Sequence, residues 1–235
     1  MTPGDIIEKM GSTGLIATCH PGNESTTIGI VKASYKGGLR LLEMKHHRED
    51  RSFYLFKRTN EETKTLSGLI MGAGGVTDAV TAEKYLQSEA QFILSPFLKE
   101  DMATVCKSYG KLWVPGCTSI NDVENAVKMG AEVVKILPAD LLGVGFFKEV
   151  GRHFPTIGLI SSGIISGKDQ ELIKWYESGI LCMQITHGLF TKEIVGLKDW
   201  AGIEFKVFSF MQRVKRIKSS LNTFAAKGDD SGQKI

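Results

Sequence analysis

The sequence VVKILPA at residues 133–139 places one amine in the middle of an apolar run of strand length. Burial penalises the charged form of a lysine, so an enclosed Lys135 has a lowered pKa and is available as a neutral amine at physiological pH. A neutral amine attacks ketones, which makes Lys135 a candidate Schiff-base lysine. From these residues alone, the alternative is a lysine at a strand end, with its stem on apolar surface and its ammonium group in water.

Apolar runs of strand length recur on both sides of this segment and alternate with longer amphipathic stretches, at a spacing of about twenty residues. Several runs are apolar at both even and odd positions, which is typical of parallel strands covered on both faces. The eight predicted strands are residues 14–19, 39–44, 69–73, 92–95, 112–115, 133–137, 157–160 and 181–185. Eight strand–helix repeats predict an α/β fold of the (β/α)8 TIM-barrel type.

Capping and stop residues agree with this pattern. Asp78 and Ser119 each precede a predicted helix, and both are residue types that cap helix N-termini. Gly130 and Gly179 follow predicted helices, where glycine is a common stop residue. The sequence therefore predicts helices between the strands, as the barrel requires.

The predicted domain organisation is one barrel with a short tail. A helix at residues 5–10 is expected to close the bottom of the barrel, and a last helix is expected at residues 203–221. Residues 1–222 form the predicted single domain, and residues 223–235 have too few apolar groups to offset their ordering entropy and are expected to be disordered. An open sheet that binds a nucleotide is the alternative fold, but no G-x-G-x-x-G motif opens the first helix.

Composition excludes several classes of protein. The formal charge of +3 is small and the basic residues are dispersed, so the electrostatic pattern of a nucleic-acid-binding protein is missing. No apolar run approaches the length that spans a bilayer, so no membrane role is expected. The four cysteines form no CxxC pair and the chain opens without a signal-like segment, so we expect free thiols and a cytoplasmic location.

Polar groups that interrupt or follow the apolar strands are the candidate site residues, because the carboxyl ends of barrel strands face the active site. They are Glu43 and Lys45, the turn at residues 72–75, Ser95, the turn at residues 115–119, Lys135, and the turns at residues 161–163 and 186–188. Strand alternation places Glu43 and Lys45 on one side. The adjacent His46 and His47 point to opposite faces and have no third ligand at suitable spacing, so no metal is expected.

Seven segments resemble, in order and spacing, the 2-keto-3-deoxy-6-phosphogluconate (KDPG) and 4-hydroxy-2-oxoglutarate (KHG) aldolase family. They are GGLRLLE, MGAGGVTD, AQFILSP, VPGCTSINDV, GAEVVKILPAD, FP and SSGI. The resemblance extends from about residue 14 to residue 190. Its most specific part is the VKxxPA strand together with the upstream PG and GAG turns, because the ordered set is rarer than any one motif. The resemblance implies a class I aldolase built on a barrel.

The resemblance implies that Lys135 forms a carbinolamine and then an imine with pyruvate, and that Glu43 shuttles protons through a water molecule. The imine makes the former ketone carbon an electron sink, so the C3–C4 bond of the substrate can break to give an enamine. A carboxylate–water relay takes the proton of the C4 hydroxyl and later returns one to the methylene carbon.

The resemblance also assigns substrate-binding residues. In the family an arginine and a threonine hold the pyruvate carboxylate, and their places are occupied here by His47 and Ser119, with Arg48 adjacent to the histidine. The substrate-binding residues predicted in this way are His47, Arg48, Gly74, Gly75, Pro115, Ser119, Ser161, Ser162, Gly163 and Thr186. No cofactor is implied.

Three parts of the sequence depart from the family pattern. The GAGTV turn reads GAGGV, so Gly75 lacks a hydroxyl near the pyruvate end. The phosphate-binding turns read SSGI and QIT, and the bulky Gln184 and Ile185 can obstruct the backbone amides that cradle a phosphate. Lys45 stands where a small polar residue is usual, and an ion pair between Lys45 and Glu43 is the structural alternative to a catalytic carboxylate.

Two functional hypotheses from different classes follow. The first is a class I aldolase that cleaves a KDPG-like or 4-hydroxy-2-oxoglutarate-like acid to pyruvate and an aldehyde. The second is a catalytically weakened trimeric barrel that acts as a binding or assembly scaffold, and it is motivated by Lys45, Gly75 and the altered phosphate turns. Both hypotheses share the homotrimer that the family resemblance implies.

Overall fold

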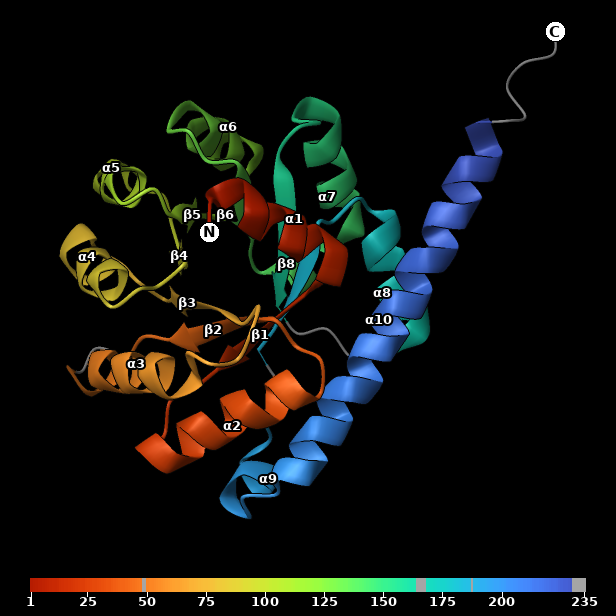
Figure 1. Cartoon of the computed structure of the whole chain (residues 1–235). Coiled ribbons are helices and arrows are strands. Elements are labelled where there is room, and N and C mark those ends of the chain that lie inside the picture. Colours follow the sequence, from red (N-terminus) through yellow and green to blue (C-terminus); the bar gives the residue numbers. More distant parts are fainter. Residues whose placement is uncertain (48–49, 164–167, 187, 230–235) are drawn as a thin grey trace, which may run out of the picture.

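The computed structural model describes residues 1–47, 50–163, 168–186 and 188–229. In this part of the chain, nine parallel strands form one sheet in the order β5-β4-β3-β2-β1-β9-β8-β7-β6, with helices around it (Figure 1). The strands are β1 Leu15–Cys19, β2 Leu41–Lys45, β3 Ile70–Gly74, β4 Phe92–Leu94, β5 Leu112–Val114, β6 Gly116–Cys117, β7 Val133–Ile136, β8 Gly158–Gly163 and β9 Cys182–Ile185. The helices are α1 Pro3–Thr13, α2 Glu24–Lys36, α3 Asp50–Thr63, α4 Ala79–Gln87, α5 Glu100–Ser108, α6 Ile120–Lys128, α7 Ala139–His153, α8 Asp169–Glu177, α9 Lys192–Gly196 and α10 Trp200–Asp229. The predicted parallel α/β barrel is confirmed.

The predicted strand at residues 112–115 ends at Val114 as β5, and a further short strand, β6, begins directly after Pro115 in the segment predicted as a turn. Strand β5 pairs with β4, whereas β6 pairs with β7, so this segment joins the two ends of the sheet and brings the barrel close to closure. Proline has no backbone N–H to donate to a sheet, but its carbonyl oxygen still accepts. The backbone N–H of Lys135 donates to the carbonyl of Pro115 at 2.8 Å, so the proline lies beside the candidate lysine.

The barrel interior is filled from one end by α1. Ile6 and Met10 of α1 are fully buried and belong to the same apolar cluster as Ile16 and Leu41 of the strands. Figure 1 shows this helix lying across one end of the barrel. The helix that the sequence predicts at residues 5–10 therefore closes the amino-terminal end, as expected.

Predicted helix caps are found where the sequence places them. The carboxylate of Asp78 accepts from the backbone N–H of Thr81 at 2.7 Å and caps α4. The hydroxyl of Ser119 accepts from the backbone N–H of Asp122 at 3.1 Å, and the Asp122 carboxylate accepts in return from the backbone of Ser119. Each cap satisfies N–H groups that have no partner within the helix, and fixes where the helix begins after its strand.

Helix α10 packs along the side of the barrel beside α2 and α8 (Figure 1). Ile203, Val207 and Val214 are fully buried against the outer apolar cluster, whereas Phe205 is 71% exposed on the opposite face. One face of the helix is thus buried against the barrel.

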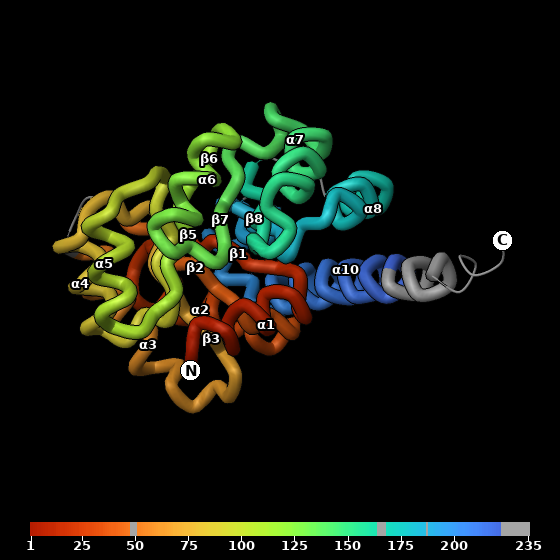
Figure 2. Tube along the Cα trace, turned by 90° about the horizontal axis from the view of Figure 1, so that it is seen from above, coloured from red at the N-terminus to blue at the C-terminus, as the bar shows by residue number. Residues whose placement is uncertain are grey.

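The last helix is longer than predicted. It begins at Trp200 and continues to Asp229, rather than ending at residue 221. The part of this helix that is drawn in blue leads away from the barrel in Figure 2. No proline interrupts this segment and its first glycine after residue 202 is Gly228, so local backbone hydrogen bonds can extend the helix. The predicted tail begins at residue 223, within the bounds of α10, and its disorder stays a prediction, because residues 230–235 lie outside the described part of the chain.

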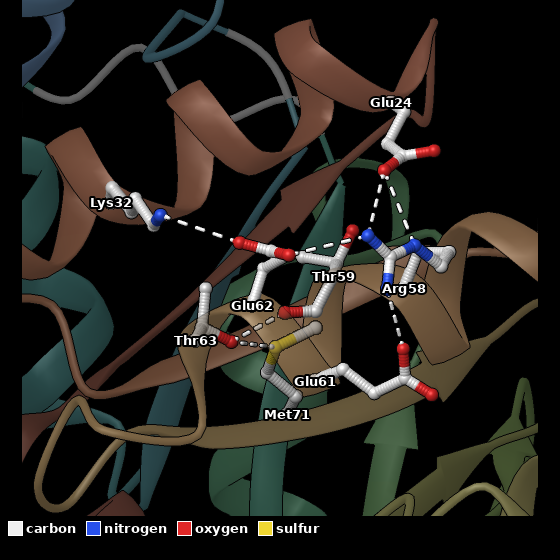
Figure 3. Close-up of polar contacts among 8 residues, drawn as sticks. All are labelled: Glu24, Lys32, Arg58, Thr59, Glu61, Glu62, Thr63 and Met71. Atoms are coloured by element: carbon white, nitrogen blue, oxygen red, sulfur yellow. Dashed lines mark hydrogen bonds and ion pairs between the residues drawn. The ribbon is translucent and has the colours of Figure 1, made fainter.

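An ion-pair cluster joins α2 and α3 on the outside of the barrel (Figure 3). The Arg58 guanidinium of α3 contacts the Glu24 carboxylate of α2 at 3.2 Å and the Glu61 and Glu62 carboxylates of its own helix at 2.7 and 3.2 Å. All four side chains are at least one-third exposed, so these ion pairs contribute little to stability.

Candidate active site

Lys135 lies in the middle of β7 and is only 3% exposed. Burial lowers its pKa, the nearby Glu43 carboxylate raises it, and the charge of Lys45 lowers it again, with a net shift below the ordinary value for lysine. Among the residues that the structure describes, no carboxylate lies within ion-pair distance of the Lys135 amine. The alternative of a solvated strand-end lysine does not fit this burial. The amine is instead enclosed and has a depressed pKa, as a nucleophilic lysine requires.

Glu43 of β2 is fully buried and is held by hydrogen bonds from two neighbouring strands. The hydroxyl of Thr18 on β1 donates to Glu43 Oε2 at 2.5 Å, and the amide nitrogen of Gln184 on β9 donates to the same oxygen. The other carboxylate oxygen, Oε1, has no hydrogen-bond partner among the described residues. One oxygen of this carboxylate is therefore fixed by the protein and one is left for other chemistry.

Gly74 of β3 provides the space in which the Glu43 carboxylate lies. A Cβ atom at position 74 would stand 1.5 Å from Glu43 Oε1 and 2.2 Å from its Cδ, so any side chain there would displace the acid. Gly72 is required in a similar way, because a Cβ atom at that position would meet the ring of Phe92 at 2.3 Å. The glycines of the GAG motif thus make room for the carboxylate and for the interior packing below it.

We expect Gly74→Ala to displace the Glu43 carboxylate and to lower the free energy of unfolding by about 1–3 kcal/mol, as overpacking does in other cores. Denaturant unfolding measures this effect. Gly145→Ala is the matched control, because a Cβ atom at position 145 meets nothing within 4 Å. A Gly74→Ala variant that is as stable as the control would contradict the close contact between Gly74 and Glu43.

Lys45 lies on the same side of β2 as Glu43, nearer the carboxyl end of the strand. Its ammonium group lies 3.2 Å from the position that a Cβ atom at residue 75 would occupy, so its side chain covers Gly75. No ion pair joins Lys45 to Glu43 in the described part of the chain, so the structural alternative for Glu43 is not found. The lysine instead fills the space beside the altered GAGGV turn.

The residues predicted to hold the pyruvate carboxylate serve other contacts. His47 is exposed, its ring centroid lies 5.5 Å from that of His20, and its backbone N–H donates to the Ser52 hydroxyl at 3.1 Å. The hydroxyl oxygen of Ser119 caps α6, as described above. Arg48 lies outside the described residues, as does His187 of the candidate turn at residues 186–188.

The predicted phosphate turns are divided between the two faces of the sheet. Ser161 is in register with Ile136 and Met183, both of which belong to the outer apolar cluster, so its buried hydroxyl faces the helices. Ser162 is in register with Gln184 and shares the interior face of the barrel.

The last residue of β8, Gly163, and the first residue after β9, Thr186, have different environments. Gly163 lies against the first turn of α7, because a Cβ atom there would meet Asp140 Oδ1 at 2.5 Å. Thr186 follows β9 directly and is partly exposed. An acidic side chain beside Gly163 opposes an approaching phosphate, since like charges repel at short range.

Sequence reasoning missed the role of two residues, Thr18 and Gln184. Each is a buried polar side chain in an otherwise apolar strand, and that interruption is the signal that could have identified them. Gln184 was expected only to obstruct phosphate, whereas its amide in fact contacts Glu43 and Thr18.

Other classes of site receive no support from the described residues. No group of three or more His, Cys, Asp or Glu side chains there is arranged to hold a metal ion. None of the helices described is both long and apolar enough to cross a membrane. The four cysteines are unpaired and buried, and burial raises the pKa of Cys19, Cys106 and Cys117 to about 12, which keeps them as unreactive thiols at neutral pH.

Comparison with known proteins agrees with this geometry. The model of the family described as "KDPG and KHG aldolase" matches residues 6–205, and the chain belongs to this family. Curated relatives include 2-dehydro-3-deoxy-phosphogluconate aldolases of Treponema pallidum, 25% identical over 137 residues, and Pseudoalteromonas atlantica, 29% identical over 140 residues. These alignments cover 58% and 59% of this chain, and the chain spans 63% of the length of each relative.

Solved structures show the same fold. One is the KDPG aldolase of Legionella pneumophila, with pyruvate captured as a covalent carbinolamine intermediate. It has a TM-score of 0.77 at 17% identity, and the matched region covers 89% of this chain and 98% of the Legionella chain. The corresponding aldolase of Zymomonas mobilis with 3-phosphoglycerate has a TM-score of 0.76 at 21% identity, covering 89% and 96%. The likeness at these identities concerns the barrel itself.

Proposed function

We propose that this chain is a class I aldolase that cleaves a KDPG-like or 4-hydroxy-2-oxoglutarate-like acid to pyruvate and an aldehyde. The observation that carries this proposal is that the interior holds both a buried Lys135 amine of lowered pKa and a buried Glu43 whose Oε1 has no hydrogen-bond partner among the described residues. Membership of the KDPG and KHG aldolase family supports the choice of reaction.

The proposed reaction uses the two side chains in sequence. The neutral Lys135 amine adds to the substrate ketone, and loss of water from the carbinolamine gives a protonated imine. Removal of the C4 hydroxyl proton, directly by Glu43 or through one water molecule, lets the C3–C4 electron pair move into the imine and releases the aldehyde. The resulting enamine takes a proton at C3, and water then hydrolyses the imine to free pyruvate and the lysine amine.

The charge of Lys45 suits the carboxylate of the oxo acid. This lysine forms no ion pair among the described residues, and its charge acts on Lys135, so the two amines share one region of the barrel interior. A substrate carboxylate placed there gains a charge-assisted hydrogen bond. Lys45 thereby supplies a cation two residues before His47, which occupies the place of the family's arginine, and its side chain occupies the space beside Gly75.

We expect Lys45→Met to weaken pyruvate binding by about tenfold, since hydrogen bonds to charged groups contribute about 1.5–3 kcal/mol and this one is partly solvated. The same change removes a charge that lowers the pKa of Lys135, so the pH at which adduct formation rises should move upward. Rates of adduct formation at several pyruvate concentrations and pH values separate the two effects. Unchanged values for both would contradict this placement of Lys45.

Borohydride trapping tests the proposed function. Incubation of the full chain with pyruvate and reductant should add one three-carbon unit, and peptide mapping should place it on Lys135. A coupled assay with lactate dehydrogenase should show release of pyruvate from 2-keto-3-deoxy sugar acids. The rates for the same sugar acid with and without a phosphate group show which form is the preferred substrate. A folded protein that forms no adduct would refute the proposal, whereas an adduct without turnover would favour the weakened scaffold.

We also propose that the enzyme is a cytoplasmic homotrimer that acts in carbohydrate metabolism. Membership of the KDPG and KHG aldolase family supports the substrate class. The trimer is what the resemblance seen in the sequence implies. Analytical ultracentrifugation of the full chain tests the assembly, because a trimer has three times the mass of the 25.8 kDa chain.

A further inference from the structure

We propose that Thr18 and Gln184 are positioning residues that hold Glu43 Oε2, so that Oε1 is the oxygen that exchanges protons with the substrate. This inference rests on the proposed aldolase function and concerns one of its steps, proton transfer. It assigns a role to two residues that otherwise look like isolated polar side chains in apolar strands.

The contacts form a closed triangle of buried groups. Thr18 Oγ1 donates to Glu43 Oε2 at 2.5 Å, and Gln184 Nε2 donates both to that oxygen and to Thr18 Oγ1, the latter at 3.0 Å. The exposed fractions of Thr18, Glu43 and Gln184 are 1%, 0% and 3%. Two fixed donors on one oxygen restrict the rotation of the carboxylate about its terminal bond.

The order of the strands explains why these three side chains meet. Strand β1 lies between β2 and β9, and Thr18 is directly in register with Glu43. Gln184 is in register with Ile16 on the other side of β1, so its longer side chain reaches along the strand toward Thr18. All three side chains point into the barrel, because residues in register on neighbouring strands share a face.

The orientation of the Gln184 amide follows from the carboxylate. With the amide nitrogen toward Glu43, the group donates to an acceptor; the reversed amide would place a carbonyl oxygen against a carboxylate oxygen. The hydroxyl of Thr18 has one proton, and donating it to Glu43 leaves the Thr18 oxygen as the acceptor for Gln184. The network therefore has one consistent direction of donation, which ends at Glu43 Oε2.

The other carboxylate oxygen, Glu43 Oε1, is fixed in place but has no hydrogen-bond partner in the part of the chain that the structure describes. Glu43 Oε1 lies over Gly74, where the backbone comes too close for any side chain. Both Glu43 Oε1 and Gln184 Oε1 are buried without a hydrogen-bond partner among the described residues. A buried acceptor left unsatisfied costs about 1–3 kcal/mol, so each favours a ligand that brings a donor. The hydroxyl of the substrate, or a water that relays its proton, has that chemistry.

Three variants test the assignment, and each is measured at two separate steps of the reaction. Thr18→Val and Gln184→Leu each remove one donor at nearly constant volume, and Thr18→Ser restores the donor of the first. Exchange of the pyruvate methyl protons with D₂O, followed by NMR, reports proton transfer at C3. Borohydride trapping, taken to completion, reports imine formation on Lys135.

We expect exchange to fall by about 10–100-fold in Thr18→Val and in Gln184→Leu, within the range that a positioned general base contributes. Trapping should still go to completion in both variants, and Thr18→Ser should regain most of the exchange rate. Thr63→Val is the control for the loss of a buried threonine hydroxyl, because Thr63 bonds to the carbonyl of Thr59 on α3, outside the site. Its exchange rate should match that of the wild type.

The outcomes separate this inference from the function on which it rests. Exchange at the wild-type rate in both donor variants overturns the positioning role, and so does an equal loss of trapping and exchange, which would indicate general damage to the barrel. Absence of trapping in the wild-type chain instead overturns the aldolase assignment itself. Exchange lost with trapping retained supports both.

Discussion

Lys135→Met is expected to abolish the pyruvate adduct and to lower the rate of pyruvate release by about 10⁴-fold or more, as removal of a catalytic nucleophile does elsewhere. Methionine fills a similar volume but has no amine, so the carbinolamine cannot form at this position. Mass spectrometry after borohydride reduction and the coupled lactate dehydrogenase assay measure the two losses. An adduct that persists and maps to Lys45 would show that the other interior lysine is the nucleophile.

The same variant should be more stable than the wild type near neutral pH. Burial lowers the pKa of Lys135 in the folded chain, so over the range between the lowered and the ordinary value the unfolded chain binds the additional proton. Stability therefore falls as the pH falls through that range, and a side chain that cannot bind a proton escapes this loss. A higher melting temperature together with lost activity would separate the missing amine from unfolding as the cause.

Glu43→Gln is expected to lower kcat by about 10²–10⁴-fold, the usual contribution of a positioned general acid–base group. Its amide oxygen can accept from Thr18 and Gln184 as the carboxylate Oε2 does, so the fold should be retained. The amide nitrogen then stands at the position of Oε1, where it cannot take up a proton. Single-turnover cleavage, measured beside the extent of adduct trapping, isolates this step.

The trapping control decides how a loss in Glu43→Gln is to be explained. Trapping on Lys135 should still go to completion, because the amine and its apolar surroundings are unchanged. A variant that keeps more than about a tenth of the wild-type cleavage rate would contradict a proton-transfer role for Glu43.

Much of the barrel could be predicted from the sequence, because its signals are local. Apolar runs separated by capped helices identify the strands, and the break at Lys135 in one such run identifies the central amine. Caps such as Asp78 are confirmed because a capping residue acts within one turn of its own helix. The short strand β6 after Pro115 was missed, since it depends on pairing with β7 and not on a pattern in its own two residues.

The arrangement of the site could be predicted only in part, because side chains that are distant in sequence determine it. Thr18 and Gln184 are separated by 166 residues and meet through the pairing of β1 with β9. Which way Ser161 faces follows from its register with Ile136 and Met183, which no single segment reveals. Motifs place residues at the ends of strands, but the register between strands decides which of them share the interior.

The packing of Ile6 and Met10 into the amino-terminal end of the barrel affects the order in which the products of the proposed reaction leave. With the amino-terminal end filled, the end of the barrel at the carboxyl termini of the strands is the route that the proposed reaction leaves for substrate, aldehyde and pyruvate. The aldehyde fragment is held by no covalent bond after cleavage, whereas the pyruvate fragment stays attached to Lys135 until water arrives. The aldehyde should therefore depart first and admit the hydrolytic water behind it, so that pyruvate is the last product to leave and competes with fresh substrate for the vacant amine.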